Sequence, residues 1–131
     1  MLNLFNTTNI INLGRIGILY KFSGEIDMKK IRITVMKQTI YKDLMDKYEN
    51  PIEQACNMKI GQVFIANGWE KPKGMCQSAW ESMSAFVMTL AHGGEDIYKG
   101  WMKNKKSAMI SCNDGFRPVS FLIETLDEDT D

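Results

Sequence analysis

The chain has 131 residues, a length that suits a single domain with one hydrophobic core. Hydrophobic residues make up 44% of it and charged residues 24%, as in an ordinary globular protein. The 16 Lys and Arg residues balance the 16 Asp and Glu residues, so no net positive field attracts nucleic acid or an anionic membrane, and neither is expected as a partner.

The cysteine content and the absence of targeting signals predict where the protein works. No apolar run approaches the roughly 20 residues that span a membrane, and no basic segment precedes a long apolar one as in a secretory signal. The three cysteines are an odd number, and no two of them are spaced as Cys-x-x-Cys. A disulfide framework usually has an even count in an exported chain. We therefore expect a cytoplasmic protein whose thiols are reduced.

Residues 1–27 differ in character from the rest, with scattered asparagines and no sustained hydrophobic period. Met28 has the features of a translation start, because Gly24-Glu25 just before it can be encoded by purine-rich codons typical of a ribosome-binding site. We expect residues 1–27 to be a poorly ordered extension and hypothesise that they are translated leader. The alternative is a genuine extension that adds an edge strand over 16–22.

From residue 28 onwards, hydrophobic spacing predicts a series of regular elements. Apolar and polar residues alternate over 30–36, which predicts a half-buried strand. Hydrophobic residues recur at helical spacing over 41–48, and Asn50-Pro51 ends this helix. A second strand is expected over 62–66.

The clearest helix is expected between residues 79 and 90, where apolar residues form one stripe. Ser78 and Glu81 have the spacing of a capping box at its start. Gly93-Gly94 follows it and is typical of a left-handed helix stop.

Two more strands are expected over 108–112 and 119–125, joined by a loop with the turn dipeptide Asp114-Gly115. Residues 127–131 are mostly acidic and are expected to be a solvated, frayed tail. Four strands and two main helices predict an α+β fold with one domain over 28–126. Its sheet is expected to be small, four-stranded, and mixed or mainly antiparallel.

Each cysteine lies at the end of an expected element, where rigid support meets solvent. Cys76 is the strongest candidate for chemistry, because free N–H groups and the dipole at a helix entry favour the reactive thiolate. Cys112 ends a strand and is followed by Asp114, a carboxylate that could accept a proton. Cys56 precedes a turn. The alternative for all three is burial as small apolar side chains, which is common for free cysteine.

Together, Cys56, Cys76 and Cys112 could supply soft ligands to zinc or to an iron–sulfur-type centre. No two of them form the close pair that structural zinc sites usually contain, so their spacing indicates a metal only weakly. His92, the single histidine, could be a fourth ligand. A histidine in the last turn of a helix more often interacts with the free carbonyl groups there.

A short basic run, Lys103-Asn104-Lys105-Lys106, follows Trp101. The plain interpretation is a solvated loop, and contact with nucleic acid or phosphate is the alternative. Trp101 itself is expected to anchor a loop or to join the core rather than to act as a stacking platform.

Several of these motifs occur in the same order in one known family. They are Cys56 with Lys59-Ile60-Gly61, the helix entry Gly74-Met75-Cys76-Gln77-Ser78-Ala79, Gly93-Gly94-Glu95, and Cys112-Asn113-Asp114-Gly115 with Arg117-Pro118-Val119. Through them, residues 29–126 resemble an uncharacterised family of small three-cysteine proteins that is frequent in anaerobic bacteria and archaea. The resemblance implies that the three cysteines and Asp114 occupy motif positions, and it implies no particular reaction. Asn113 stands where that family usually has proline.

These observations predict a thiol-based function, in which the cysteines form a metal-binding or redox site and the partner is a redox protein or a second copy of the chain. An accessory binding module whose thiols only pack is the alternative from another class. A third hypothesis is an enzyme with Cys76 as nucleophile and Asp114 or Glu95 as acid or base. These three hypotheses differ in whether the sulfur atoms of the three cysteines lie close together around one opening.

Overall fold

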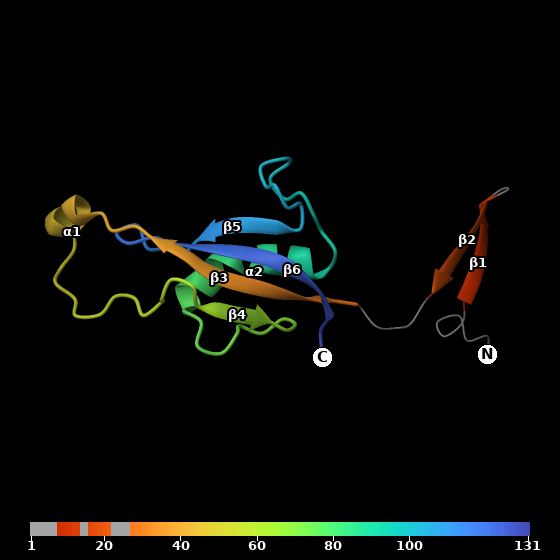
Figure 1. Ribbon diagram of the computed structural model, residues 1–131, viewed down its shortest axis with the longest axis horizontal. Helices are drawn as coiled ribbons and strands as arrows, with labels where there is room; N and C mark the ends of the chain where they lie inside the picture. Colours follow the sequence, from red (N-terminus) through yellow and green to blue (C-terminus); the bar gives the residue numbers. More distant parts are fainter. Residues whose placement is uncertain (1–7, 14–15, 22–26) are drawn as a thin grey trace.

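The computed structural model describes residues 8–13, 16–21 and 27–131. Figure 1 shows its elements in chain order. They are β1 (Thr8–Leu13), β2 (Ile16–Lys21), β3 (Lys29–Gln38), α1 (Lys42–Tyr48), β4 (Val63–Ala66), α2 (Gln77–Ala91), β5 (Ser107–Ser111) and β6 (Val119–Asp129). Within these described ranges, neither helix is long and apolar enough to cross a membrane.

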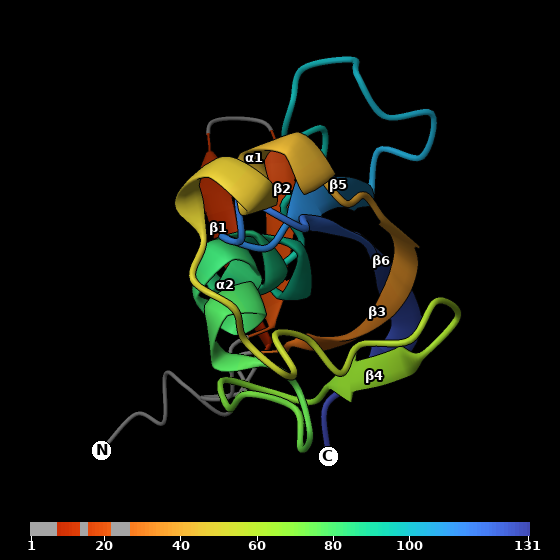
Figure 2. The same cartoon turned by 90° about the vertical axis from the view of Figure 1, so that its left-hand side faces the viewer.

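Strands β3 to β6 form one four-stranded sheet in the order β4-β3-β6-β5. All three pairings in it are antiparallel, which confirms the α+β class and the mainly antiparallel sheet. The two long strands, β3 and β6, lie at its centre, and α2 packs against one face (Figure 2). Two strands that are far apart in sequence therefore form the middle of the sheet. The positions of their ends determine where the connecting loops lie.

The core lies between α2 and this face of the sheet. Ile31, Ile33 and Val35 alternate along β3 and are all fully buried, as the period of two predicts. Side chains of this size stabilise a fold by about 1.5–3 kcal/mol each when they leave water completely. The buried face of α2 consists of Ala79, Trp80, Met83, Val87, Leu90 and Ala91. Phe86, which also belongs to the predicted stripe, is half-buried at its edge.

Helix α2 begins differently from the prediction. Cys76 is its N-cap residue and Gln77 its first helical residue, so Ser78 lies inside the first turn and no capping box forms with Glu81. The Gln77 side chain instead donates a hydrogen bond to the Glu81 carboxylate at 3.1 Å. The helix thus starts at a cysteine whose side chain makes no capping hydrogen bond.

The end of α2 is as predicted. Gly93 has a φ of +88°, in the left-handed region that favours glycine. The N–H groups of Gly93 and Gly94 donate to the carbonyls of Leu90 and Thr89 at 3.1 and 2.8 Å. These two bonds satisfy carbonyls that the last helical turn leaves free.

Helix α1 is present as predicted, but it does not cover the sheet. It has seven residues and none of them is buried. The segment before it is attached to the β5–β6 loop, because the N–H groups of Thr39 and Tyr41 donate to the carbonyls of Pro118 and Phe116 at 3.0 and 2.8 Å. Helical spacing alone does not show whether a helix has a surface to pack on, and this one extends the end of β3 (Figure 1).

Strands β1 and β2 pair with each other as a separate antiparallel sheet. The edge strand expected over 16–22 therefore exists as β2 over 16–21, but it pairs with β1 and not with the main sheet. Residues 1–7, 14–15 and 22–26 lie outside the described residues. That residues 1–27 are translated leader stays a prediction.

The acidic end of the chain was expected to be a frayed tail over 127–131, but β6 continues to Asp129. Lys29 Nζ lies 2.8 Å from Asp129 Oδ1, and the Thr130 N–H donates to the Met28 carbonyl at 2.8 Å. The lysines at the start of β3 neutralise the acidic residues opposite them, and this cross-strand pairing extends the strand.

Candidate functional site

The three cysteines line a single cavity of about 200 Å³. It lies where the loop after α1, the entry of α2 and the β5–β6 loop meet, and each of these segments contributes one cysteine. The antiparallel pairing of β5 with β6 brings the third segment beside the helix entry, and the Asn113 side chain donates to the Ser78 carbonyl at 3.2 Å across that contact. Residues 56, 76 and 112 are therefore neighbours in space although they are far apart in sequence.

The thiols differ in exposure. Cys76, at the N-cap of α2, is exposed to solvent. Cys56 and Cys112 are half-buried and pack against the hydrophobic core. One thiol is thus open to a large reaction partner, while the other two are reached through the cavity.

Backbone N–H groups point at the two half-buried sulfur atoms. The Val119 N–H donates to Cys112 Sγ at 3.3 Å, and the Met58 N–H donates to Cys56 Sγ at 3.5 Å. Donors of this kind favour negative charge on sulfur, as they do around thiolates in metal and redox sites. Each of these two half-buried sulfur atoms therefore accepts one backbone hydrogen bond.

Asp114 is held in place by its own loop. Its Oδ1 accepts hydrogen bonds from the N–H groups of Phe116 and Arg117 at 2.8 and 3.1 Å, and its Oδ2 accepts one from Arg117 Nη1 at 2.9 Å. Burial acts to raise the pKa of Asp114, but these hydrogen bonds and the guanidinium charge outweigh it and lower the pKa. The carboxylate is ionised with both oxygens engaged, so its evident role is to shape the loop, and a role as proton acceptor gains no support.

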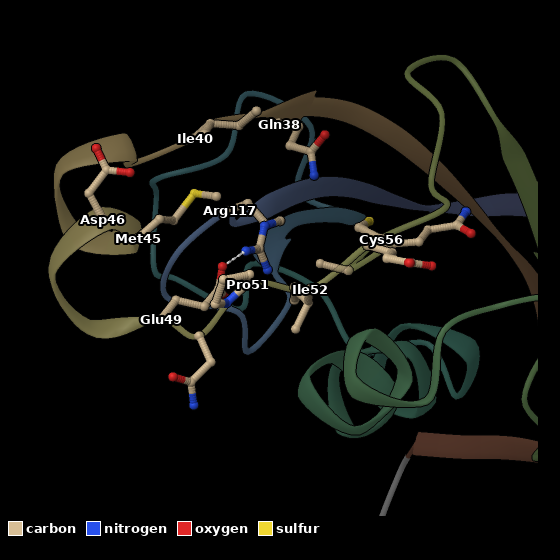
Figure 3. A pocket seen from close by; sticks show the side chains of 13 residues that line it. Gln38, Ile40, Met45, Asp46, Glu49, Pro51, Ile52, Cys56 and Arg117 are labelled. Atoms are coloured by element: carbon tan, nitrogen blue, oxygen red, sulfur yellow. Dashed lines mark hydrogen bonds and ion pairs between the residues drawn. The ribbon is translucent and has the colours of Figure 1, made fainter.

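Arg117 connects the thiol cavity to α1. Its side chain is only 10% exposed and forms ion pairs with Asp114 and with Glu49, whose side chain is 15% exposed. Figure 3 shows the guanidinium directed toward Glu49. Sequence analysis did not single out Arg117 or Glu49 as site residues. The one available signal was the position of Arg117 three residues after Asp114, which suits an ion pair across a turn.

A larger groove of about 620 Å³ adjoins the thiol cavity. Ala55, Cys56 and Arg117 line both spaces, so they form the shared wall. On the far side the groove is bounded by Gln38 at the end of β3, by Ile40 in the segment that follows, and by Met45 of α1 (Figure 3). A molecule bound in this groove would lie against Cys56.

Two other candidate residues lie away from the cysteines. His92 is at the opposite end of α2, where its Nδ1 lies 2.8 Å from the Met88 carbonyl and its ring lies 5.2 Å from that of Trp69, with the planes inclined by 50°. This confirms the interaction of His92 with the helix end. Glu95 follows it and lines a different cavity. Because α2 has 15 residues, each adding about 1.5 Å, Glu95 is too distant to act as acid or base for Cys76.

The arrangement of the donor groups determines whether a metal ion would fit these cysteines. In the part of the chain that the structure describes, no three His, Cys, Asp or Glu side chains are grouped so that they could hold an ion. Cys56, Cys76 and Cys112 share a cavity without closing on a common centre.

Comparisons with known proteins add no family to this description. The chain matches no family model, no curated protein and no solved structure. The resemblance to the family of small three-cysteine proteins stays a prediction.

Proposed function

We propose that Cys56, Cys76 and Cys112 act together in thiol–disulfide exchange with a redox partner. The observation that carries the proposal is the single cavity lined by all three cysteines, with one thiol exposed and two half-buried. Exchange needs one accessible thiol to attack the partner and a second, protected thiol beside it to complete the reaction.

The exchange proceeds in two steps. The Cys76 thiolate attacks one sulfur of a partner disulfide; a mixed disulfide forms, the partner S–S bond breaks, and the other partner sulfur leaves as a thiolate that takes up a proton. The thiolate of Cys112 or Cys56 then attacks Cys76 Sγ, forms a disulfide within the chain and releases the second partner thiolate. Two protein thiols are oxidised, and the partner disulfide is reduced to two thiols. The reverse sequence oxidises a partner dithiol.

The surroundings of the sulfur atoms support these roles. Cys76 precedes the first turn of α2, whose N–H groups lack intrahelical partners and favour a negative charge nearby. Cys112 Sγ and Cys56 Sγ each accept a backbone N–H. Each sulfur atom in the cavity therefore lies beside backbone N–H groups, and the thiolate is the form of cysteine that attacks sulfur.

Binding of a soft metal by the same three cysteines is the second candidate, and the N–H donors to sulfur favour it as well. Zinc–sulfur bonds of about 2.3 Å would require the three sulfur atoms to draw together around the ion. Because the donor groups are not arranged in that way, exchange is the better supported form of thiol chemistry. A module whose thiols only pack would need no shared cavity.

The test uses protein purified without oxygen, analysed for metals and then mixed with oxidised glutathione. We expect wild-type protein to lose two titratable thiols and two hydrogens in mass, without a retained glutathione adduct. Cys76→Ser should prevent the reaction, and replacement of the resolving cysteine should trap glutathione on Cys76. Three unreactive thiols in metal-free protein would contradict the proposal, and stoichiometric zinc or iron would favour the metal site instead.

A further inference from the structure

The loop between α2 and β5 differs in charge from the rest of the molecule. The loop residues, 92–106, contain four lysines and two acidic residues, Glu95 and Asp96, although the whole chain has no net charge. Lys99, Lys103, Lys105 and Lys106 are all exposed. None of the ion pairs found among the described residues includes any of them. Their charges are available to an anionic partner.

The same loop presents an aromatic ring to solvent. Trp101 is 80% exposed and its ring stacks on that of Tyr98, with centroids 5.1 Å apart and planes inclined by 30°. The Tyr98 ring in turn lies 6.0 Å from that of Phe86, a half-buried residue of α2. The exposed indole therefore contacts α2 indirectly, through the rings of Tyr98 and Phe86. The face of the indole that points away from Tyr98 is open to solvent. Trp101 therefore does not join the core, and it contacts the fold through the Tyr98 ring.

The backbone of the loop is held in a defined shape. Asp96 and Lys99 have φ values of +56° and +52°, a conformation that non-glycine residues adopt only where their surroundings impose it. Asp96 Oδ1 accepts the Gly100 N–H at 2.7 Å, and the Asp96 N–H donates to the Lys105 carbonyl at 2.7 Å. Figures 1 and 2 both show this loop projecting from the body of the sheet. Trp101 and the lysines thus project together from a fixed support.

We propose that this loop binds single-stranded nucleic acid. A base would stack on the open face of Trp101 while neighbouring phosphates meet Lys103 and Lys105, the combination by which proteins bind single strands without reading their sequence. An acidic peptide would use the lysines and leave the indole without a role. A membrane surface would need more apolar area, because Trp101 is the one large apolar residue exposed in this loop. Since the remainder of the chain adds no positive field, binding should be weak and steeply salt-dependent.

The test is fluorescence anisotropy of a labelled ten-nucleotide oligothymidylate titrated with the full chain at low salt. We expect a dissociation constant on the order of 10–100 µM that weakens as salt rises. Trp101→Ala should weaken binding by about tenfold through loss of stacking, and Trp101→Phe should retain most of it. The double variant Lys103→Ala/Lys105→Ala should weaken binding and lower its salt dependence.

The chain offers matched controls outside the loop. Trp69 is also exposed, and Lys71 and Lys73 are exposed lysines nearby, so Trp69→Ala and Lys71→Ala/Lys73→Ala should leave binding unchanged. The proposal is overturned if the oligonucleotide does not bind, if Trp101→Ala binds as wild type does, or if the control variants lose as much affinity. Binding to phosphatidylserine vesicles without binding to the oligonucleotide would also overturn it. All these substitutions are at exposed positions, and thermal melting verifies that each variant is folded.

Discussion

Arg117 forms an ion pair with Glu49, a residue 68 positions away in sequence, in the wall between the thiol cavity and the adjoining groove. The same guanidinium binds Asp114 within the β5–β6 loop. One cation thus joins the segment after α1 to the loop that follows Cys112. The shape of the cavity in which the cysteines meet depends on this pairing.

Replacing Arg117 by Met should destabilise the protein, because two carboxylates then lose their cation in a poorly solvated place. Both side chains of the Arg117–Glu49 pair are mostly buried, so we expect a larger loss in the free energy of unfolding, measured by urea denaturation, than for an exposed ion pair. Arg32→Met is the matched control, since its pair with Glu124 is more exposed and is worth less than about 1 kcal/mol. Equal losses in the two variants would contradict the role given to Arg117.

Stability should fall in acid partly through Asp114. Its pKa is lower in the folded protein than its ordinary value of 3.8, so its contribution is present above that value and is lost as the pH falls through the lower folded pKa. The unfolding free energy of Asp114→Asn should therefore change less than that of wild type when the pH is lowered from 7 to below about 4. A wild-type curve for Asp114→Asn would count against this assignment.

The thiols should react in the order of their exposure. With a disulfide reagent such as dithiobis(nitrobenzoate), we expect Cys76 to give the fast phase and the half-buried Cys56 and Cys112 the slower ones. Cys76→Ser should remove the fast phase alone, while Cys56→Ser should leave it in place. Peptide mapping after brief alkylation gives an independent measurement, and first labelling at Cys56 or Cys112 would be the opposite result.

The turn after α2 should not tolerate a side chain at Gly94. A Cβ there would lie 2.6 Å from Thr89 Cγ2 and 2.7 Å from the Thr89 carbonyl oxygen. Gly94→Ala should therefore destabilise the protein by about 1–3 kcal/mol in thermal or urea unfolding. Gly115→Ala is a suitable control, because no atom lies within 4 Å of a Cβ at that position. Similar melting curves for the two variants would show that the helix end relaxes freely.

The parts of the fold that sequence predicts are those with a repeated local pattern. The alternation of Ile31, Ile33 and Val35 and the stripe of α2 each report a face that must be buried, and both are buried. The position of α1 is different, because a short amphipathic pattern carries no information on whether a partner surface exists. The extension of β6 to Asp129 likewise depends on the lysines of the strand opposite.

For the candidate site, the sequence predicted the type of reactive group but not how these groups are arranged in space. Cysteines at the ends of elements indicate reactive groups, but no local pattern shows that Cys56, Cys76 and Cys112 share one cavity. The ion pair of Arg117 with Glu49 is equally invisible, because it joins segments that only the strand pairing brings together. Sequence spacing therefore suggested a proton acceptor at Asp114, where the structure shows a carboxylate whose oxygens are already engaged.

The most direct test of the thiol site is to locate the bond formed on oxidation. After anaerobic protein is treated with oxidised glutathione and digested, mass spectrometry of the peptides should find a disulfide that joins Cys76 to Cys112 or to Cys56. Because these residues are far apart in sequence, such a peptide arises only if their sulfur atoms can meet. Recovery of Cys76 with glutathione still attached, while Cys56 and Cys112 remain free thiols, would contradict the account.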